Sequence, residues 1–397
     1  MTSSTLSSPN AVSRLWRNKE SRGVIIQIVT MAVVFGLIAA IGRNVVINLE
    51  AVGKDFSFGF LLWPAAYDIG FSPFIEYTNK STHLIAGVVG LLNTLLIAFW
   101  GCILATILGF ILGIMRLSSN WLVSRISYVF VEFVRNVPVL IHILGIYAVV
   151  VTLLPSTKQA LNLGGDAFFL SNRGFYVPAP VYESGAGVVG VVLLISIALA
   201  IGFKRWARRQ QDQTGKIYPV LWVSLGLLLG LPAVAFFAMG MPISWDVPVL
   251  KGFNFQGGMA IKPEFLALWL GLSYYTSAFI AEIVRAGIMA VSHGQTEAAH
   301  ALGLRPNRTL QLIIVPQALR IIVPPLCSQY LNLTKNSSLA IAIGYMDITA
   351  TLGGISLMQT GKEMETMLIV MGIYLVISLL ISSFMNWFNH RIKLTER

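Results

Sequence analysis

The chain has 397 residues, of which 56% are hydrophobic and 11% are charged, and its formal net charge at pH 7 is +11. About a quarter of the residues in a soluble globular domain are charged, so this composition excludes an ordinary soluble protein. A basic surplus can serve nucleic-acid binding, but here the basic residues lie beside the ends of apolar runs. That placement is typical of cytoplasmic flanks of membrane helices and argues against a nucleic-acid partner. The flanking residues are Arg14, Arg17, Lys19, Arg22, Arg116, Arg125, Lys204, Arg205, Arg208, Arg209, His390, Arg391 and Lys393.

The apolar runs predict an all-α polytopic membrane protein with about eight transmembrane helices of about 20 residues each. With the basic flanks inside, both termini are expected in the cytoplasm. The first run is long enough to stay as a spanning helix, so no cleaved signal peptide is expected. Cys102 and Cys327 lie inside apolar runs, which argues against a disulfide framework. The predicted spans lie near 24–42, 86–115, 133–154, 186–203, 219–240, 265–287, 320–346 and 365–388.

Three long segments are expected on the outer side. Residues 51–84 are rich in aromatic residues and suit the membrane interface, whereas 155–185 and 241–264 carry the Gly and Pro typical of loops. Such long loops either face a partner or simply cap the helices. The basic link 204–217 is expected to be a cytoplasmic turn, with binding of anionic membrane lipid as the alternative.

One polar segment, between the spans ending near 287 and starting near 320, has the features of a short helix with defined ends. Ser292 and Gln295 have the spacing of a capping box. The run from Gln295 to Leu302 consists mostly of good helix formers, and Gly303 stands where a left-handed residue would end the helix. Pro306 suits the first turn of a second short helix, which is predicted to end near Pro316.

The first of these short helices has a surface of small residues, which allows close approach to another backbone. We therefore interpret it as a peg that enters a groove of a soluble partner; an amphipathic interfacial helix without a partner is the alternative. The candidate contact residues are Gly294, Gln295, Glu297, Ala298, Ala299, Leu302, Gly303 and Pro316.

The sequence around this segment resembles a known family. Glu297-Ala298-Ala299, Gly303 and the later 314–316 resemble the EAA loop of permease subunits of bacterial ABC importers. The stretches 282–287, 316–320, 132–140 and 333–339 are similar to the polar amino-acid branch of that family. Two local departures are Ser292-His293 before Gly294 and Arg305-Pro306 after Gly303.

The resemblance covers roughly 86–154 and 265–389 and implies a five-helix type I, MetI-like permease core. The remaining segments are additions, and the enlarged layout is similar to the larger permease subunit of general L-amino-acid ABC importers. The implied division is an N-terminal helix and aromatic loop, the first part of the core, inserted loops with a helical hairpin, and the second part of the core with the coupling loop 288–319. In residue numbers these parts are 1–85, 86–154, 155–264 and 265–389.

The resemblance also implies the partners. The chain has no G-x-x-x-x-G-K-[ST] phosphate loop, no metal-ligand spacing and no nucleophile with an evident base. We therefore expect no catalytic residue, no metal and no cofactor of its own, with ATP held by two separate ATP-binding subunits. A second, different permease subunit and a periplasmic amino-acid-binding protein complete the expected complex in a bacterial inner membrane.

A second polar stretch, Thr334, Lys335, Asn336, Ser337 and Ser338, lies inside the last-but-one predicted span. A charge at membrane depth is costly, and irregular backbone there must line a cavity or be buried in protein. We expect this break to line the translocation pathway, with Lys335 meeting either a substrate α-carboxylate or acceptors at a subunit interface. Glu132 and Arg135 are expected to form a local pair.

Three other functions compete with an ATP-driven importer. A secondary transporter driven by an ion gradient predicts symmetric halves and intramembrane carboxylates, and neither is evident. A membrane-embedded enzyme needs clustered catalytic side chains within the spans, and none is visible. A structural assembly subunit would use the coupling loop for docking alone.

Overall fold

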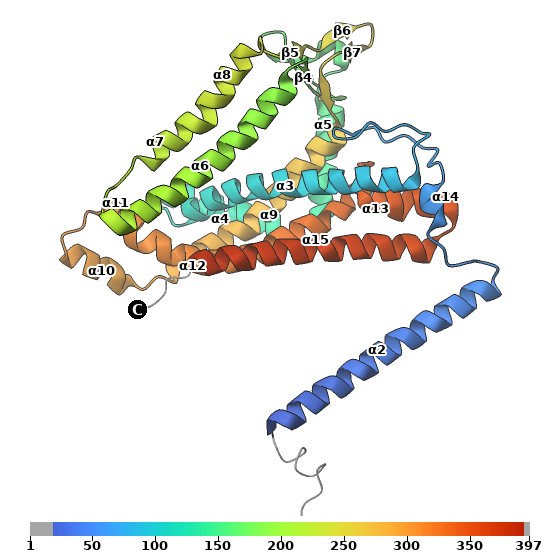
Figure 1. Cartoon of the computed structure of the whole chain (residues 1–397), viewed down its shortest axis with the longest axis horizontal. Coiled ribbons are helices and arrows are strands. Elements are labelled where there is room, and N and C mark those ends of the chain that lie inside the picture. The colour runs from blue at the N-terminus through green and yellow to red at the C-terminus, as the bar shows by residue number, and fades with distance from the viewer. Residues whose placement is uncertain (1–18, 393–397) are drawn as a thin grey trace, which may run out of the picture.

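The computed structural model describes residues 19–392, so Arg14, Arg17 and Lys393 of the basic flanks lie outside the described residues. Long helices dominate the fold (Figure 1). Within the described range seven helices are long and apolar enough to cross a membrane, or eight if one bent pair counts as a single span. This confirms the prediction of a polytopic helical protein. The long helices are α2 (Lys19–Ala51), α3 (His83–Arg116), α4 (Trp121–Asn136), α5 (Val139–Leu153), α6 (Ala186–Thr214), α9 (Pro263–Met289), α12 (Val315–Asn336) and α15 (Glu363–Ile392).

The bent pair corrects the predicted span 133–154. Instead of one straight helix, α4 and α5 meet at an angle of 106°. Val137 is extended, with φ −104° and ψ 133°, and the ring of Pro138 favours this conformation because it disfavours the helical region for the residue before it. Asn120 begins α4 by accepting hydrogen bonds from the backbone of Leu122 and Val123. The apolar run 133–154 is therefore divided at Pro138 between α4 and α5.

α3 and α9 pack at close range and form the centre of the fold. A Cβ placed on Gly113 would come within 2.7 Å of the Val284 Cβ, and one on Gly101 within 3.1 Å of Leu333 Cδ2 on α12. Small residues at four-residue spacing let helix backbones approach in this way. The core around the α3–α9 contact contains completely buried side chains, namely those of Ile97, Leu268, Leu272, Ile280 and Leu333.

A hairpin of helices lies beside the core. α6 packs on a second helical segment, which consists of α7 (Val220–Leu225), a π-helical turn (Gly226–Gly230) and α8 (Leu231–Ala238). Gly215 ends α6 in the left-handed conformation, with φ +72°. In Figure 1 this hairpin forms the upper edge of the molecule and leads to a group of short strands.

Those strands belong to the two segments that were predicted as loops, so the prediction missed a β-region. β3 pairs with β8 through Phe175 and Ile261, and β4 pairs with β5 through Ala179 and Asp246, which joins 155–185 to 241–264. The rings of Tyr176 in β3 and Phe255 in β7 pack with their centroids 4.5 Å apart. The strands are β1 (Leu161–Gly164), β2 (Phe168–Ser171), β3 (Gly174–Val177), β4 (Ala179–Tyr182), β5 (Ile243–Asp246), β6 (Val249–Lys251), β7 (Asn254–Gln256) and β8 (Met259–Ile261).

The N-terminal helix stands apart from this body (Figure 1). In the described part of α2, none of its most apolar stretch is buried. The linker after it is fixed to the start of α15 by two ion pairs, Lys54 with Glu363 at 2.9 Å and Lys362 with Asp55 at 2.8 Å. The linker at the end of α2 is therefore held against the start of α15, whereas the most apolar stretch of α2 is not covered by other described residues.

The predicted span 320–346 also differs from the structure. α12 begins earlier, at Val315, and ends at Asn336, where the chain tightens into a 3₁₀ helix (Ser337–Ile343). Gly344, with φ +78°, stops this helix. The change of helix type coincides with the predicted polar break. Short helices α13 (Ile348–Ala350) and α14 (Leu357–Thr360), separated by a π-helical turn, then lead to α15.

Candidate functional site

The polar segment forms the short helix α10 (His293–Ala301), which starts four residues after the end of α9. Its end matches the prediction. Gly303 has φ +73°, its N–H donates to the His300 carbonyl at 2.9 Å, and the Leu304 N–H donates to the Ala299 carbonyl at 3.1 Å. This is the hydrogen-bond pattern of a Schellman motif. Figure 1 places α10 at one extremity, past the ends of α9 and α12.

The predicted capping box is wrong. The Ser292 side chain makes no capping hydrogen bond to α10. The Gln295 N–H instead donates to the Ser292 carbonyl at 3.0 Å, which satisfies this donor by a backbone turn. The Gln295 side chain accepts from Gln317 Nε2 at 3.3 Å and so links α10 to the first turn of α12.

The predicted end of the second short helix near Pro316 is also wrong. Pro306 opens α11 (Pro306–Thr309) as expected, but a π-helical turn (Leu310–Ile314) follows and runs directly into α12. Pro316 lies in the first turn of α12, where the wider π register changes to the α register. A proline lacks the N–H of a regular helix, and a change of register accommodates this loss without ending the helix.

The candidate contact residues fall on two sides of α10. Ala299 is 1% exposed, and α10 packs against the π-helical turn. Gly294, Gln295, Glu297, Ala298 and Leu302 are exposed, and the Leu302 side chain is 81% exposed. α10 is thus held on one face and free on the other.

The charge on this free surface is locally paired. Glu297 Oε1 lies 3.1 Å from His293 Nδ1, one turn away, and both side chains are mostly exposed. An exposed pair of this kind contributes about 0–1 kcal/mol. The surface therefore offers an acidic point, small residues and one exposed leucine.

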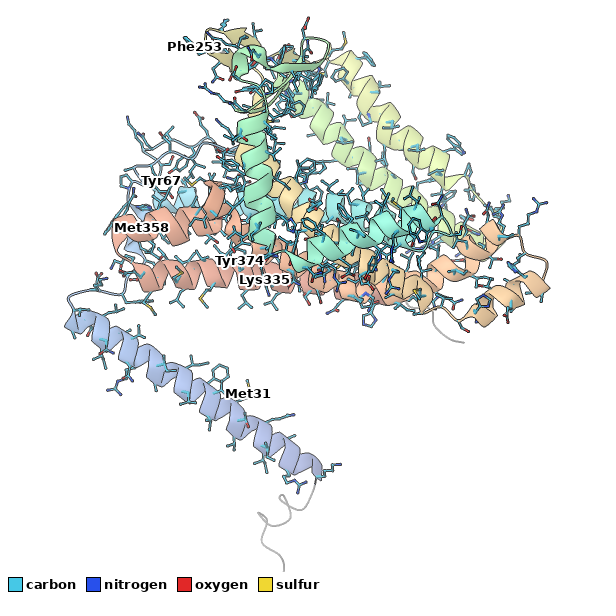
Figure 2. All side chains as sticks on the ribbon, turned by 180° about the vertical axis from the view of Figure 1, so that it is seen from behind. Met31, Tyr67, Phe253, Lys335, Met358 and Tyr374 are labelled. Carbon is cyan, nitrogen blue, oxygen red and sulfur yellow. The ribbon has the colours of Figure 1, made fainter. Side chains whose placement is uncertain are left out.

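The predicted polar break spans the last turn of α12 and the start of the 3₁₀ helix, and its residues have different surroundings. Thr334 and Ser337 are buried, with their hydroxyls donating to the carbonyls of Tyr330 and Thr334. Lys335 is exposed and has no ion pair with any residue in the range 19–392; Figure 2 shows its place on the body of the molecule. Asn336 and Ser338 are half-buried. The structure therefore does not bring the five predicted pathway residues to one surface.

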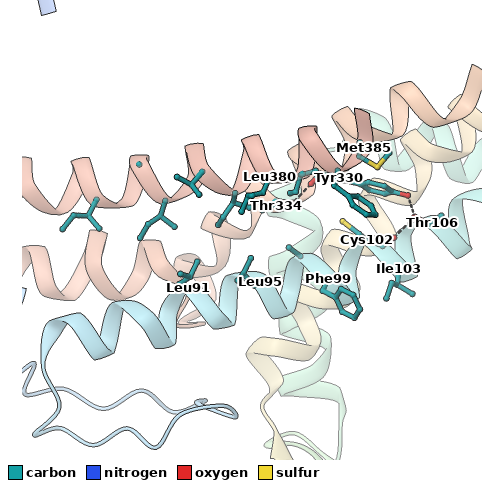
Figure 3. Close-up of a pocket in the computed structure, with 18 of the residues that line it drawn as sticks. Leu91, Leu95, Phe99, Cys102, Ile103, Thr106, Tyr330, Thr334, Leu380 and Met385 are labelled. Carbon is teal, nitrogen blue, oxygen red and sulfur yellow. Dashed lines mark hydrogen bonds between the residues drawn. The ribbon is translucent and has the colours of Figure 1, made fainter. Parts of the chain in front are cut away.

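Thr334 alone of these residues lines a groove between α3, α12 and α15, with a volume of about 1060 Å³ (Figure 3). Its other lining side chains are mostly aliphatic or aromatic. Thr106 Oγ1 and Tyr330 Oη are hydrogen-bonded to each other at 2.8 Å within it. A groove of this composition suits lipid or an apolar protein surface rather than an amino acid.

Sequence reasoning missed a buried carboxylate, Asp347. Its Oδ1 accepts from the Ala350 N–H at 2.8 Å and caps α13, and its Oδ2 accepts from the Tyr374 hydroxyl at 3.2 Å. The side chain is completely buried. An Asp three residues before a helical N–H is a local capping signal that could have revealed it.

Sequence reasoning also treated Glu132 and Arg135 as an isolated pair. They are 3.5 Å apart, but they belong to a larger group in which Arg116 of α3 contacts Glu282 of α9 and lies 4.0 Å from Glu132 of α4. Arg285 completes the group, with its Nη2 2.5 Å from Glu282 Oε1. We call these five residues the α3–α4–α9 ion cluster.

Comparison with known proteins identifies the class of protein to which this helical body belongs. Residues 216–394 match the family described as "Binding-protein-dependent transport system inner membrane component". The chain is 46% identical to the general L-amino acid transport system permease protein AapQ of Rhizobium johnstonii, over 95% of this chain and 93% of that protein. It is 47% identical to the glutamate/glutamine/aspartate/asparagine transport system permease protein BztB of Rhodobacter capsulatus, over 97% of each. Among solved structures, a chain from an amino acid ABC transporter crystallised with histidines aligns with a TM-score of 0.45 and 20% identity, over 78% of this chain and 95% of that one.

The chain therefore belongs to the family of amino-acid ABC transporter permease subunits. It is a multi-pass membrane protein, and a permease subunit of this class is not itself the ATPase of the transporter. The alternative of a secondary transporter driven by an ion gradient is not supported.

Proposed function

We propose that the chain is the larger permease subunit of an ATP-driven importer of L-amino acids and that α10 is the contact through which a separate ATPase drives it. The observation that carries this proposal is the construction of α10. It is a closed short helix with one buried residue, Ala299, and an exposed surface formed by Glu297, Ala298 and Leu302. A rigid helix exposed in this way can enter a groove of a soluble subunit without unfolding.

The position of α10 allows a push on it to reach the transmembrane helices. α9 enters it and α12 follows it, and the two helices touch closely, because a Cβ on Gly287 would lie 2.4 Å from Ile322 Cγ1. The Gln295–Gln317 hydrogen bond adds a second link. When ATP binding closes two ATPase subunits, α10 is expected to move and to carry α9 and α12 with it. ATP is held by those subunits, and this chain supplies no cofactor site.

The proposed orientation places α10 and both termini in the cytoplasm. In Figure 1 the C-terminal end of α15, α10 and the α6–α7 turn all lie toward the same side of the view. That turn follows the basic run 204–209, and Lys/Arg-rich short loops favour the cytoplasmic side. The β-region then faces the periplasm of a bacterial inner membrane, where an amino-acid-binding protein would deliver substrate. The second permease subunit of the complex is expected to differ from this one.

We further propose that Lys335 acts in translocation. A lysine at membrane depth that has no acidic partner in the described chain must find one elsewhere. One candidate is the α-carboxylate of the substrate, and the other is a carboxylate or carbonyl of the second permease subunit. Thr334, Asn336, Ser337 and Ser338 are its neighbours in sequence and are proposed to shape the same region.

Charge reversal tests the coupling proposal. We expect Glu297→Lys to lower copurification of the ATPase and amino-acid uptake at least about tenfold, which corresponds to about 1.4 kcal/mol. Membrane insertion should be normal, because within residues 19–392 the ion pair of Glu297 is with the exposed His293. The measurements are pull-down of the ATPase from solubilised membranes and uptake of labelled amino acid.

Two substitutions of the helix-ending glycine supply a matched pair. Gly303 has no described atom within 4 Å of an added Cβ, so only its positive φ restricts the residue. Asn tolerates the left-handed region and Val does not. Gly303→Val should therefore impair coupling much more than Gly303→Asn. Normal pull-down and normal uptake in both Glu297→Lys and Gly303→Val would contradict the proposal.

A further inference from the structure

The α3–α4–α9 ion cluster joins the ends of three helices just before the chain enters α10. Glu282 lies at its centre, because Oε2 accepts from Arg116 and Oε1 accepts from Arg285 Nε at 3.1 Å. Arg116 also faces Glu132, and its guanidinium lies 5.2 Å from the centre of the Tyr128 ring. One arginine therefore connects α3 to both neighbouring helices.

The cluster is shielded from water at its key point. The Arg116 side chain is 8% exposed, and that of Glu282 is 27% exposed. Removing one partner from such a pair leaves a poorly solvated charge behind. Arg135 and Arg285 lie at the margin with about a third of each side chain exposed.

The helices that meet at the cluster are already closely packed. Gly113, one turn before Arg116, abuts Ala281 and Val284, on either side of Glu282 along α9. α4 in contrast contacts the core through Val131 and Val134 and then turns sharply into α5. Close packing at the α3 glycines makes α3 and α9 one unit. The described polar links of α4 to that unit all involve Arg116 or its neighbours in the ion cluster, because the Ser124 hydroxyl of α4 also donates to the Arg116 carbonyl at 3.0 Å.

We propose that Arg116 and Glu282 are positioning residues that transmit the movement of α10 to α4 and, through the bend at Val137–Pro138, to α5. This inference rests on the proposed coupling function of α10. A displacement of the α9 end would pull Arg116 and Glu132 with Glu282. Because α5 crosses at 106°, a shift of α4 along its axis becomes a lateral shift of α5, which packs on α9. The cluster thus links the proposed ATPase contact to α5, beyond the bend that follows α4.

A double-mutant cycle on the reconstituted transporter tests this. Arg116→Gln, Glu282→Gln and the double variant are assembled with the ATPase and binding protein in liposomes, and amino acid moved per ATP hydrolysed is measured. We expect each single variant to lower this ratio at least about fivefold, the lower limit of ordinary coupling between sites, with ATPase still bound and ATP still hydrolysed. The loss in the double variant should be clearly smaller than the sum of the single losses, because each substitution removes the same Arg116–Glu282 contact. Arg116→Lys should restore part of the ratio by keeping the charge.

The chain offers a control ion pair that joins other elements. Glu363→Gln breaks the contact with Lys54, at the base of α2, and should leave the ratio unchanged. An unchanged ratio in both cluster variants, strictly additive losses in the double variant, or loss of the assembled complex in all variants including Arg116→Lys would overturn the inference. Failure of the α10 proposal gives a different result, because the ATPase would then stay bound in Glu297→Lys.

Discussion

Gly109 of α3 lies so close to Ile280 of α9 that an added Cβ would come within 2.5 Å of the Ile280 Cβ and 3.1 Å of the Ser277 carbonyl oxygen. No side chain larger than hydrogen fits there without separating the helices. We expect Gly109→Ala to destabilise the protein by about 1–3 kcal/mol, the usual cost of overpacking. Thermal unfolding of the purified protein in detergent measures this loss.

The control is a helical glycine in open surroundings. Gly372 of α15 has no described atom within 4 Å of an added Cβ. Gly372→Ala should be neutral or stabilising by about 0.5–1 kcal/mol, because alanine loses less backbone entropy in a helix. Equal unfolding temperatures for Gly109→Ala and Gly372→Ala would show that the space between α3 and α9 at Gly109 accommodates a methyl group.

The parts of the fold that the sequence could predict are those that depend on residues close together in the chain. Apolar runs and helix-ending residues act locally, so the spans, the left-handed Gly303 and the polar break at the end of α12 were predictable. Pro138 was visible too, but a prediction based on apolar length placed it inside one helix. The β-region could not be predicted in this way, because β3 pairs with β8, a strand more than 80 residues later that follows the whole helical hairpin.

The candidate site divides in the same way. The ends of α10 follow from its own residues, whereas the partner of Gln295 is Gln317, 22 residues away. Arg116 and Glu282 are 166 residues apart in sequence, and only the packing of α3 on α9 makes them a pair. Each charge could be seen in the sequence, but its partner depended on the tertiary fold.

The tether at the base of α2 should depend on pH. A hydrogen bond from Lys362 lowers the pKa of Asp55, and the same contact raises the pKa of Lys362. A lowered carboxyl pKa stabilises the folded contact above the unfolded value of about 3.9 and loses that effect as the pH falls through the folded pKa. The raised pKa of Lys362 keeps the ammonium charged, so its contribution is lost only as the pH rises through that value.

We therefore expect the linker after α2 to loosen below about pH 4. Hydrogen exchange of residues 52–60, normalised to intrinsic rates, should show less protection there than at pH 7. Asp55→Asn should show the low-pH behaviour at pH 7, whereas Glu76→Gln, at an exposed acid in the following segment, should match the wild type. Equal protection of wild type and Asp55→Asn at pH 7 would mean that the ion pair does not hold the linker.

The exposed charge of Lys335 gives the most direct test of the translocation proposal. A hydrogen bond between charged groups is worth about 1.5–3 kcal/mol, so Lys335→Ala should lower amino-acid uptake about 10- to 150-fold. Lys335→Arg keeps the charge and should retain more uptake. Asn332→Ala, at an exposed polar residue one turn earlier on α12, should transport normally.

If Lys335 meets the substrate, uptake falls while the complex stays intact; if it pairs with the second permease subunit, the yield of assembled complex falls as well. Wild-type uptake by Lys335→Ala in an intact complex would exclude both roles, because substrate binding and subunit pairing both require the ammonium group that this substitution removes.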